Sequence, residues 1–338
     1  MNSVTPNTTT ELSSSIARRL RLPLIAAPMF RVSGPELVIA ACRQGVIGSF
    51  PTANCRTVEE YDRWLCEIGA ALTPEDAPFC PNLIMRRRSL KEELACLLKH
   101  KVEMVITSVG EPRPVIGPLH DIGCLVFADV ANVRHAEKAI AAGADGLILL
   151  TAGAGGQTGW ANGFAFVRAV RAMFDGPLVL AGGIGDGQAL WAARTLGCDL
   201  GYMGTKFIAT RESLAAEGYK RMLVDSRLDD IMLSRAFTGL ETNTLRPSVI
   251  AAGLDPDNLP IDMTEERAAA LYGGGSDSPG PKRWVDVWSA GHSVSGVSGV
   301  PSVTELVART VQEYRRAQAE TLSLLDSSSN GSEGRSCG

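Results

Sequence analysis

Three glycine-rich stretches in the middle of the chain hold the residues best suited to bind a ligand. They read LLTAGAGGQTGW (149–160), AGGIGDG (181–187) and YMGTKF (202–207). Glycine lets another group approach the backbone closely, and it adopts positive φ without steric cost. Backbone N–H groups in such loops bind phosphate, especially where a helix follows. The stretches therefore predict a phosphorylated ligand held by the main chain at Gly182, Gly183, Gly204 and Thr205.

Other candidate residues stand at the ends of apolar runs earlier in the chain. Pro28 and Met29 end the first run, and Asn82, Ser108 and Asp129 lie at the ends of later ones. Asn82 and Asp129 carry hydrogen-bonding groups that can bind a ligand or, alternatively, cap a loop. The sequence leaves both readings open.

These candidates are positioned by apolar runs that read as strands. Eight short runs are continuously apolar rather than alternating, which is typical of parallel strands covered on both faces. They span residues 22–29, 45–50, 79–85, 102–108, 124–130, 145–150, 177–182 and 199–204.

Helix-like stretches separate the runs and complete the prediction of an α/β fold, a (β/α)8 TIM barrel. The stretches are 35–44, 57–68, 89–99, 112–121, 133–142, 164–174 and 188–196, of which 112–121 is the weakest because of its prolines and glycines. Active sites of such barrels lie at the carboxyl ends of the strands. The candidate residues and the loop 153–159 should therefore converge there.

The alternation of apolar runs and helix-like stretches ends after the eighth run. We expect residues 212–280 to form a helical lid on the substrate side, inserted into a barrel domain made of 16–211 and 281–320. An amphipathic helix over 303–317 should return to the barrel wall. Residues 1–15 and the low-complexity tail 321–338 are predicted to be disordered.

A dinucleotide-binding Rossmann site is disfavoured. A G-x-G-x-x-G/A pattern that starts at Gly153 needs glycine or alanine at position 158, where this chain has Thr158. A pattern that starts at Gly183 needs glycine or alanine at position 188, where the chain has Gln188. No acidic residue follows at the expected distance beyond the next strand. Tight turns without any ligand remain the alternative for each glycine-rich loop.

Composition excludes several classes of protein. The 338 residues are 45% hydrophobic and 21% charged, with a net charge of -4, so nothing favours nucleic acid or anionic lipid. The eight cysteines lack metal-ligand spacing and predict buried, reduced thiols in a cytoplasmic protein without a metal site. No secretion signal and no apolar run of about 20 residues is present, so we expect no membrane contact.

The chain resembles the nitronate monooxygenase family, formerly 2-nitropropane dioxygenases, which are FMN-dependent TIM barrels. The resemblance extends over residues 15–317. It is carried by LIAAPMFRVSGPELVIAACRQGVIGSFP (24–51), PNLIM (81–85), FADVANVRHAEKAIAAGADGLILLTAGAGGQTG (127–159), GPLVLAGGIGDGQAL (176–190), DLGYMGTKFIAT (199–210) and WSAGHSVSGVSGVPSVTELV (288–307).

This resemblance implies noncovalent FMN as the cofactor. The phosphate is expected on Gly182, Gly183, Gly204 and Thr205. The ring and pocket residues are expected to be Ala27, Pro28, Met29, Asn82, Ser108, Asp129, Gly153 and Gly156. Lys206 either screens the phosphate charge or is a surface lysine.

One departure from the family pattern concerns the catalytic base. The best-known enzymes carry histidine in a Gly-Gly-His element, whereas this chain has Gln157, whose amide has no useful basicity near neutral pH. His292 stands where relatives often have glutamine, and it either replaces the base or supports the cofactor. We expect His100, His120 and His135 on the surface. Arg246 is a candidate for binding an anionic substrate or, equally, a lid salt bridge.

The expected activity is oxidation of a nitronate or nitroalkane with O2 to a carbonyl compound and nitrite. An NAD(P)H-dependent flavin reductase of quinones or enoyl thioesters is the alternative enzyme, and a flavin-binding scaffold without catalysis is the third hypothesis. The expected partners are a small-molecule substrate and O2, with a homodimer left open.

Overall fold

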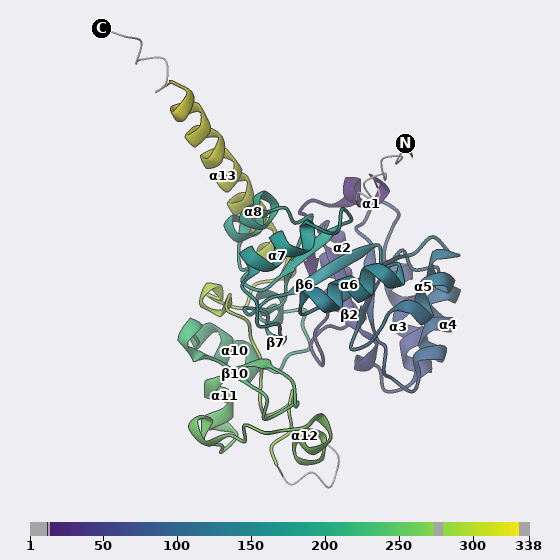
Figure 1. The fold of residues 1–338 in the computed structure, drawn as a ribbon, viewed down its shortest axis with the longest axis vertical. Helices are drawn as coiled ribbons and strands as arrows, with labels where there is room; N and C mark the ends of the chain where they lie inside the picture. Colours follow the sequence, from purple (N-terminus) through teal and green to yellow (C-terminus); the bar gives the residue numbers. More distant parts are fainter. Residues whose placement is uncertain (1–11, 13, 274–279, 331–338) are drawn as a thin grey trace, which may run out of the picture.

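Eight parallel strands close into a barrel, as predicted (Figure 1). The computed structural model describes residues 12, 14–273 and 280–330. Strand β1 pairs with both β2 and β9, which closes the ring. In order around the barrel, the strands are β1 (Leu24–Ala26), β2 (Ile47–Pro51), β3 (Phe79–Ile84), β4 (Met104–Ser108), β5 (Leu125–Val130), β6 (Gly146–Leu150), β8 (Leu178–Ala181) and β9 (Leu200–Met203).

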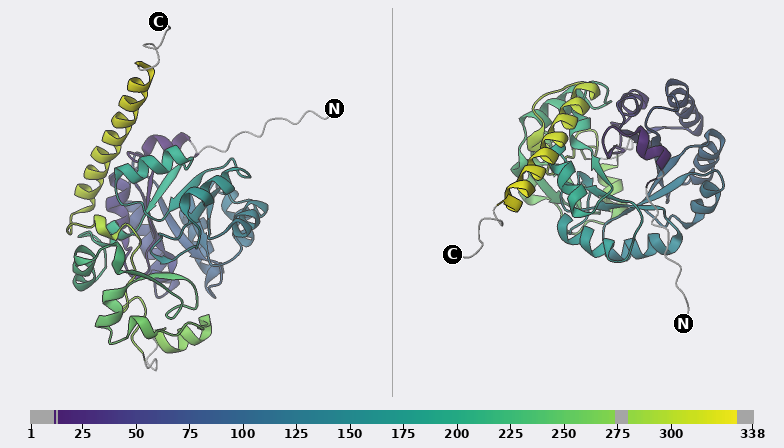
Figure 2. Two further views of the ribbon diagram at one scale, coloured as in Figure 1. Left: turned by 60° about the vertical axis from the view of Figure 1, so that its left-hand side comes forward. Right: turned by 90° about the horizontal axis from the view of Figure 1, so that it is seen from above.

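Helices surround the barrel as a ring, which is seen from above in Figure 2. All seven predicted helices form, and the proline-containing α5 begins with prolines at positions where a helix lacks N–H partners anyway. Four others begin at side chains that cap a backbone N–H: Thr57, Asn132, Asn162 and Asp186. The helices are α2 (Pro35–Arg43), α3 (Val58–Ala71), α4 (Leu90–His100), α5 (Arg113–His120), α6 (Val133–Ala142), α7 (Gly163–Arg171) and α8 (Gly187–Leu196), with short η1 (Thr52–Asn54) and α9 (Thr205–Ile208).

The barrel interior is apolar at one end and polar at the other. Ile25, Phe127 and Ile148 belong to a fully buried cluster inside the strands. Helix α1 (Ser14–Arg19) adds Ile16 to this cluster. The amino end of the barrel is therefore filled with side chains, and any ligand must enter from the carboxyl end.

The lid contains strands as well as helices, so the prediction of a purely helical lid was wrong. Strands β10 (Ile231–Ser234) and β11 (Thr242–Leu245) form an antiparallel sheet with β7 (Gly156–Gln157). β11 has the short, largely polar sequence TNTL, so no apolar run marked it as a strand. It pairs with the nearby β10 and with β7, which lies far earlier in the chain. The other elements are α10 (Glu217–Asp225), η2 (Leu228–Asp230), α11 (Arg246–Ala251), η3 (Pro256–Asn258), α12 (Glu265–Tyr272) and η4 (Val294–Gly296).

The lid has its own small core. Phe237, Val249 and Tyr272 pack there together with Val287. Because Val287 follows the predicted lid boundary at residue 280, the lid side extends further along the chain than expected. A second cluster, which includes Ile208, Leu223 and Val294, joins the lid to the barrel.

The last helix is longer than predicted. Helix α13 (Val303–Asn330) packs on α8, where Trp191 Nε1 donates to Thr321 Oγ1 at 2.9 Å. Figures 1 and 2 show α13 extending beyond the barrel on the side away from the lid. The prediction of disorder is therefore wrong for 321–330, and also for Ser14 and Ser15, which are helical. Residues 1–11, 13, 274–279 and 331–338 lie outside the described residues, so the disorder predicted for both ends is untested there.

Among the described residues, no helix combines the length and apolarity needed to cross a membrane. These residues contain no cluster of potential metal ligands. The seven cysteines they include are unbonded, and all except Cys66 are buried. Burial raises the pKa of the Cys42 thiol to about 12, which makes it unreactive. Cys337 lies outside the described part.

Candidate cofactor and substrate site

A cavity of about 570 Å³ opens at the carboxyl end of the barrel, next to the lid. This size lies within the usual range of small-molecule sites, roughly 300–1,000 Å³. The lining brings together Gln157 and every residue predicted to bind the cofactor: Ala27, Pro28, Met29, Asn82, Ser108, Asp129, Gly153, Gly156, Gly182, Gly183, Gly204 and Thr205.

Backbone N–H groups converge on one end of this cavity, which we call the amide end. The amides of Gly182, Gly183, Gly204 and Thr205 make no hydrogen bond with any described residue. Most backbone N–H groups in folded proteins are paired, so four unpaired donors in one lining are unusual. Such donors, without a carboxylate among them, suit an anion such as phosphate.

The glycines of this end serve two different purposes. Gly183 has φ +79, and a Cβ added there would meet nothing within 4 Å, so the missing side chain leaves the cavity open. By contrast, a Cβ on Gly155 would lie 2.7 Å from the amide nitrogen of Gly291. Gly155 therefore permits two loops to pack together, and Gly183 permits a ligand to approach.

The middle of the cavity has a polar floor, formed at the ends of strands β3, β4 and β5. Ser108 Oγ donates to Asn82 Oδ1 at 3.0 Å, which leaves Asn82 Nδ2 without a partner among the described residues. Asp129 Oδ1 is buried and also lacks a hydrogen bond within the described part. Burial raises the pKa of Asp129 to about 7. Neither side chain caps a loop, the alternative left open by the sequence.

The unpaired hydrogen-bonding groups of this cavity fit FMN. Four unpaired amides match a phosphate, and an unpaired amide nitrogen and an orphaned carboxyl oxygen match the polar edge of a flavin ring. An unsatisfied buried acceptor costs free energy unless a ligand pairs with it.

The opposite end of the cavity, which we call the lid end, is held by the sheet that β7 forms with the lid. Gln157 lines the cavity from β7, is exposed, and its side chain makes no hydrogen bond in the described ranges. Asn243 is buried and donates through Nδ2 to Ala152 O at 2.8 Å and Ala154 O at 2.7 Å. The lid thus fixes the glycine-rich loop from which Gln157 projects.

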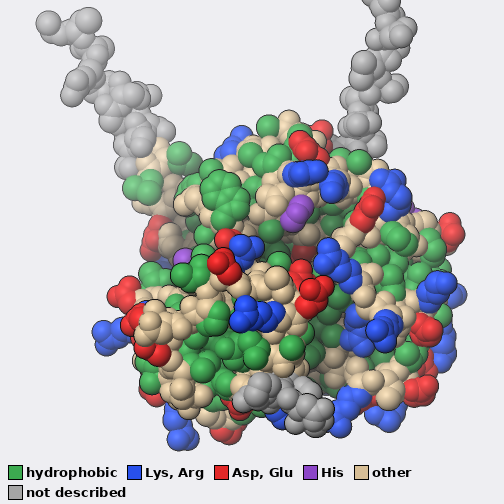
Figure 3. Space-filling view, turned by 60° about the horizontal axis from the view of Figure 1, so that its bottom comes forward, with side chains coloured by type: hydrophobic (Ala, Val, Ile, Leu, Met, Phe, Trp, Pro, Cys, Tyr) green, Lys and Arg blue, Asp and Glu red, His purple; other side chains and the backbone are tan. Residues whose placement is uncertain are grey.

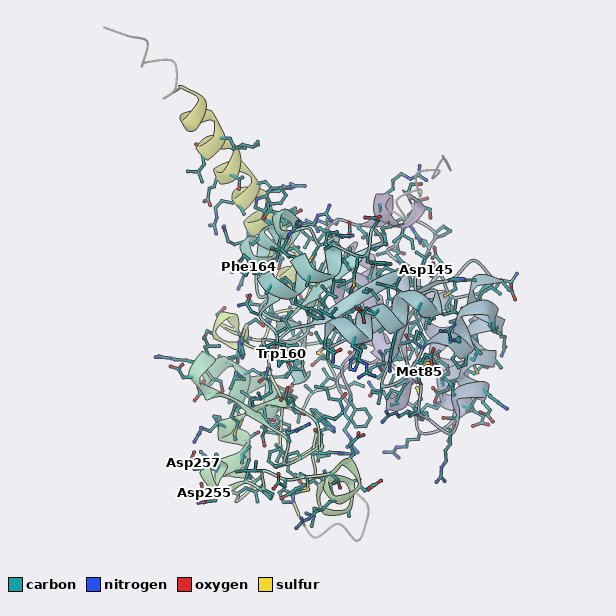
Figure 4. All side chains as sticks on the ribbon, in the orientation of Figure 1. Met85, Asp145, Trp160, Phe164, Asp255 and Asp257 are labelled. Atoms are coloured by element: carbon teal, nitrogen blue, oxygen red, sulfur yellow. The ribbon has the colours of Figure 1, made fainter. Side chains whose placement is uncertain are left out.

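Three side chains considered at the sequence level lie elsewhere. His292 is exposed and does not line the cavity, although its backbone N–H donates to Gly153 O at 3.0 Å. Arg246 does not line the cavity and pairs at 3.0 Å with Asp257, which Figure 4 labels on the lid. Of its two proposed roles, the lid salt bridge is the one observed. Lys206 is buried behind the lining, so it is not a surface lysine.

The three other histidines lie on outer helices, as expected. His100 contacts Asp62 at 2.7 Å, and His120 contacts Asp145 at 2.8 Å. His135 is exposed. None of the three lines the cavity.

Sequence reasoning missed the cationic and aromatic side chains of the lining. Arg31, Arg87, Arg283 and Trp284 all contribute to it, while Asp129 is the one carboxyl group among its described residues. Charged side chains of both signs are interspersed over this face of the molecule in Figure 3. The excess of arginine inside the lining favours an anionic ligand. Arg31 and Arg87 each follow an apolar run. This position, or a place beside the lid, is the only signal that could have indicated them as cavity residues.

Backbone strain is concentrated in the same lining. Four non-glycine residues among those described have positive φ, and Arg31, Val109 and Trp284 line the cavity. The fourth, Lys101, ends helix α4. Positive φ costs of order 1 kcal/mol or more for such residues and is enriched at functional sites. This supports the cavity as the functional region of the molecule.

Comparison with family models identifies the family of this chain. Residues 85–313 match the family model described as nitronate monooxygenase. A nitronate monooxygenase of Pseudomonas aeruginosa is 28% identical over 353 residues, covering 88% of this chain and 97% of the relative. The solved structure of nitroalkane oxidase from Streptomyces ansochromogenes has a TM-score of 0.76 and 25% identity, covering 91% of this chain and 100% of that one.

A third relative has a different name. The (3aS,4S,5R,7aS)-5-hydroxy-7a-methyl-1-oxo-octahydro-1H-indene-4-carboxyl-CoA dehydrogenase of Rhodococcus jostii (strain RHA1) is 27% identical over 228 residues. The match covers 68% of this chain and 64% of the relative, slightly under two thirds of its length.

Proposed function

This chain belongs to the nitronate monooxygenase family, and from that premise we propose that it is an FMN-dependent enzyme that oxidises an anionic nitronate with O2. The products would be a carbonyl compound and nitrite. The observation that carries the proposal is the group of four unpaired amides at Gly182, Gly183, Gly204 and Thr205, in a cavity that is also lined by three arginines.

In this proposal, one end of the cavity binds the cofactor and the other binds the substrate. The amide end binds the phosphate of FMN, and Asn82 Nδ2 and Asp129 Oδ1 pair with the flavin ring. Bound FMN supplies the redox chemistry, because it can accept electrons from the substrate and pass them to O2. The chain itself contributes binding, orientation and the shaped surface around the reacting atoms.

Gln157 supports a nitronate rather than a neutral nitroalkane as the substrate. Its side-chain amide can hold a substrate oxygen but cannot remove a proton from carbon near neutral pH. A nitronate is already deprotonated and needs no base. The arginines of the lining favour the same choice, since they stabilise an anion.

An NAD(P)H-dependent reductase acting on quinones or enoyl thioesters is the second candidate. It is favoured by the absence of a basic residue at position 157 and by the name of the Rhodococcus relative, a carboxyl-CoA dehydrogenase. The same flavin site would serve both reactions.

The test begins with the absorption spectrum of the purified protein, which should show a flavin. Anaerobic mixing with ethyl nitronate should then bleach the flavin, and NADH should not. Fast bleaching by NADH would favour the reductase. Oxygen consumption no faster than that of free FMN with every donor would indicate a flavin-binding scaffold, and a colourless protein that refuses FMN would refute the proposal.

A further inference from the structure

A buried carboxylate lies directly behind the cavity wall. Glu93, in the first turn of α4, is 2% exposed. Its oxygens accept hydrogen bonds from Thr52 Oγ1 at 2.6 Å and Ser89 Oγ at 2.7 Å, and Oε1 lies 2.9 Å from Arg87 Nε. Burying a carboxylate costs several kcal/mol unless it is paired and hydrogen-bonded, and replacing such a pair with apolar residues is often stabilising. Stability alone therefore does not explain this arrangement.

Arg87 uses only one of its nitrogens to hold this carboxylate. Nε contacts Glu93 and Ser89, whereas Nη1 and Nη2 make no hydrogen bond or ion pair within the described residues. Arg87 lines the cavity, and its side chain is 27% exposed. The terminal nitrogens of a guanidinium form a planar fork that matches two oxygens of a planar anion. A fork fixed from behind loses little side-chain entropy when it binds.

The other two arginines of the lining are held less firmly. Arg31 is exposed, and its guanidinium carbon lies 5.7 Å from the centre of the Phe30 ring. Arg283 donates through Nη1 to Phe237 O at 3.2 Å. Neither forms an ion pair with a carboxylate in the described part of the chain. Arg87 is therefore the pre-organised cation of the three.

We propose that Arg87 binds the planar anionic group of the substrate and determines the preference of the cavity for anions, and that Glu93 is its positioning residue. The identity of that group as a nitronate rests on the proposed function. The binding of a planar anion by Arg87 does not, so the two claims can fail separately.

The direct test measures binding of nitrate, a planar monoanion, to the flavin-loaded protein by isothermal titration calorimetry. Arg87→Gln should raise the dissociation constant for nitrate about 10- to 100-fold, the usual effect of losing a charge-assisted hydrogen bond. Arg86→Gln is the matched control. Arg86 is adjacent in sequence, does not line the cavity, and pairs with exposed Glu265 at 3.8 Å. An equal effect of both variants, or no nitrate binding by the wild type, would overturn the proposal.

Glu93→Gln and Arg87→Lys separate positioning from folding. Glu93→Gln keeps the shape of the side chain, since its Oε1 accepts from one of the hydroxyls of Thr52 and Ser89 and its Nε2 donates to the other. It removes the charge that fixes Arg87, so nitrate should bind several-fold more weakly. The double variant R87Q/E93Q should bind nitrate no worse than R87Q, because both changes act on one interaction. Additive effects would reject the positioning role. Arg87→Lys keeps the charge beside Glu93 and should fold normally, yet without the fork it should still bind nitrate about 10-fold more weakly.

Turnover then links this residue to the proposed reaction. With ethyl nitronate, Arg87→Gln should raise KM about 10- to 100-fold and leave kcat within about threefold, because the contact is present before and during the reaction. A change in kcat with constant KM would reject a binding role. If the wild type binds nitrate through Arg87 but oxidises no nitronate, the proposed function fails and the anion site stands.

Discussion

The amide end and the lid end of the cavity recognise ligands in opposite ways. The amide end consists of main-chain donors on two consecutive barrel loops, at Gly182–Gly183 and Gly204–Thr205. The lid end consists of side chains from distant parts of the chain, among them Arg87, Gln157 and Trp284. Backbone donors are supplied by any residue, so only the absence of a side chain matters at the first end. At the second end, the identity of each side chain matters.

This difference suggests which properties of the protein can vary. Loops of a barrel can change their side chains without changing the strands that carry them. Substitutions at the lid end should therefore alter the substrate while the cofactor stays bound. Substitutions at the amide end should remove the cofactor and with it every activity. The following predictions test this division, from the largest expected effect to the smallest.

Gly183→Val should abolish FMN binding, since the new side chain would fill the space where the phosphate is expected. We expect the affinity for FMN to fall more than about 1,000-fold, measured by flavin fluorescence during titration. Gly123→Val is the matched control, because Gly123 has φ +77, has nothing within 4 Å of its added Cβ, and lies outside the cavity lining. Loss of FMN in both variants would point to backbone strain rather than a blocked site.

Asp129→Asn tests the floor between the two ends. The raised pKa of about 7 means that the folded protein keeps a proton that the unfolded chain loses near pH 4. The free energy of unfolding of the flavin-free protein should therefore fall as pH rises from about 4 to 7, by up to about 4 kcal/mol. Asparagine should flatten this slope, as measured by urea unfolding at several pH values. Parallel curves for both proteins would contradict the assignment.

Gln157→His should sharpen the role of the lid end. An imidazole at this position can act as a base, so turnover of neutral nitroethane relative to ethyl nitronate should rise about 100-fold. FMN content should not change, because the proposed phosphate contacts are main-chain amides that the substitution leaves in place. An unchanged substrate ratio, measured by oxygen consumption, would show that position 157 does not face the substrate carbon.

Arg246→Ala should have the smallest effect. Its ion pair with Asp257 is exposed on both sides and lies outside the cavity lining. Exposed ion pairs contribute about 1 kcal/mol or less, so thermal stability should change little and KM for nitronates should stay the same. A KM raised tenfold would show that the lid moves this arginine into the cavity when substrate binds.

Features formed by neighbouring residues could be predicted from the sequence, whereas features formed by residues far apart in the chain could not. Each barrel strand is an apolar run in itself, so all eight could be predicted, and the barrel rule then placed Asn82, Ser108 and Asp129 at one end. The lid strand β11 was not predicted, because TNTL is short and largely polar, and one of its two partners, Gly156–Gln157, lies in a distant loop. His292 was nominated from the family resemblance and Arg246 from its positive charge, and the structure places both outside the cavity lining.

The sequence by itself determined the barrel and the glycines of the amide end. A buried strand is visible as a continuous apolar run, and a missing Cβ is visible as a glycine, so both can be read from neighbouring residues. Only the tertiary structure decided which side chains line the cavity. Arg87, Gln157 and Trp284 come from distant parts of the chain and line it together. The three-dimensional fold also places Glu93 behind Arg87 and buries Asp129, and these surroundings, rather than the residue types, set their chemistry.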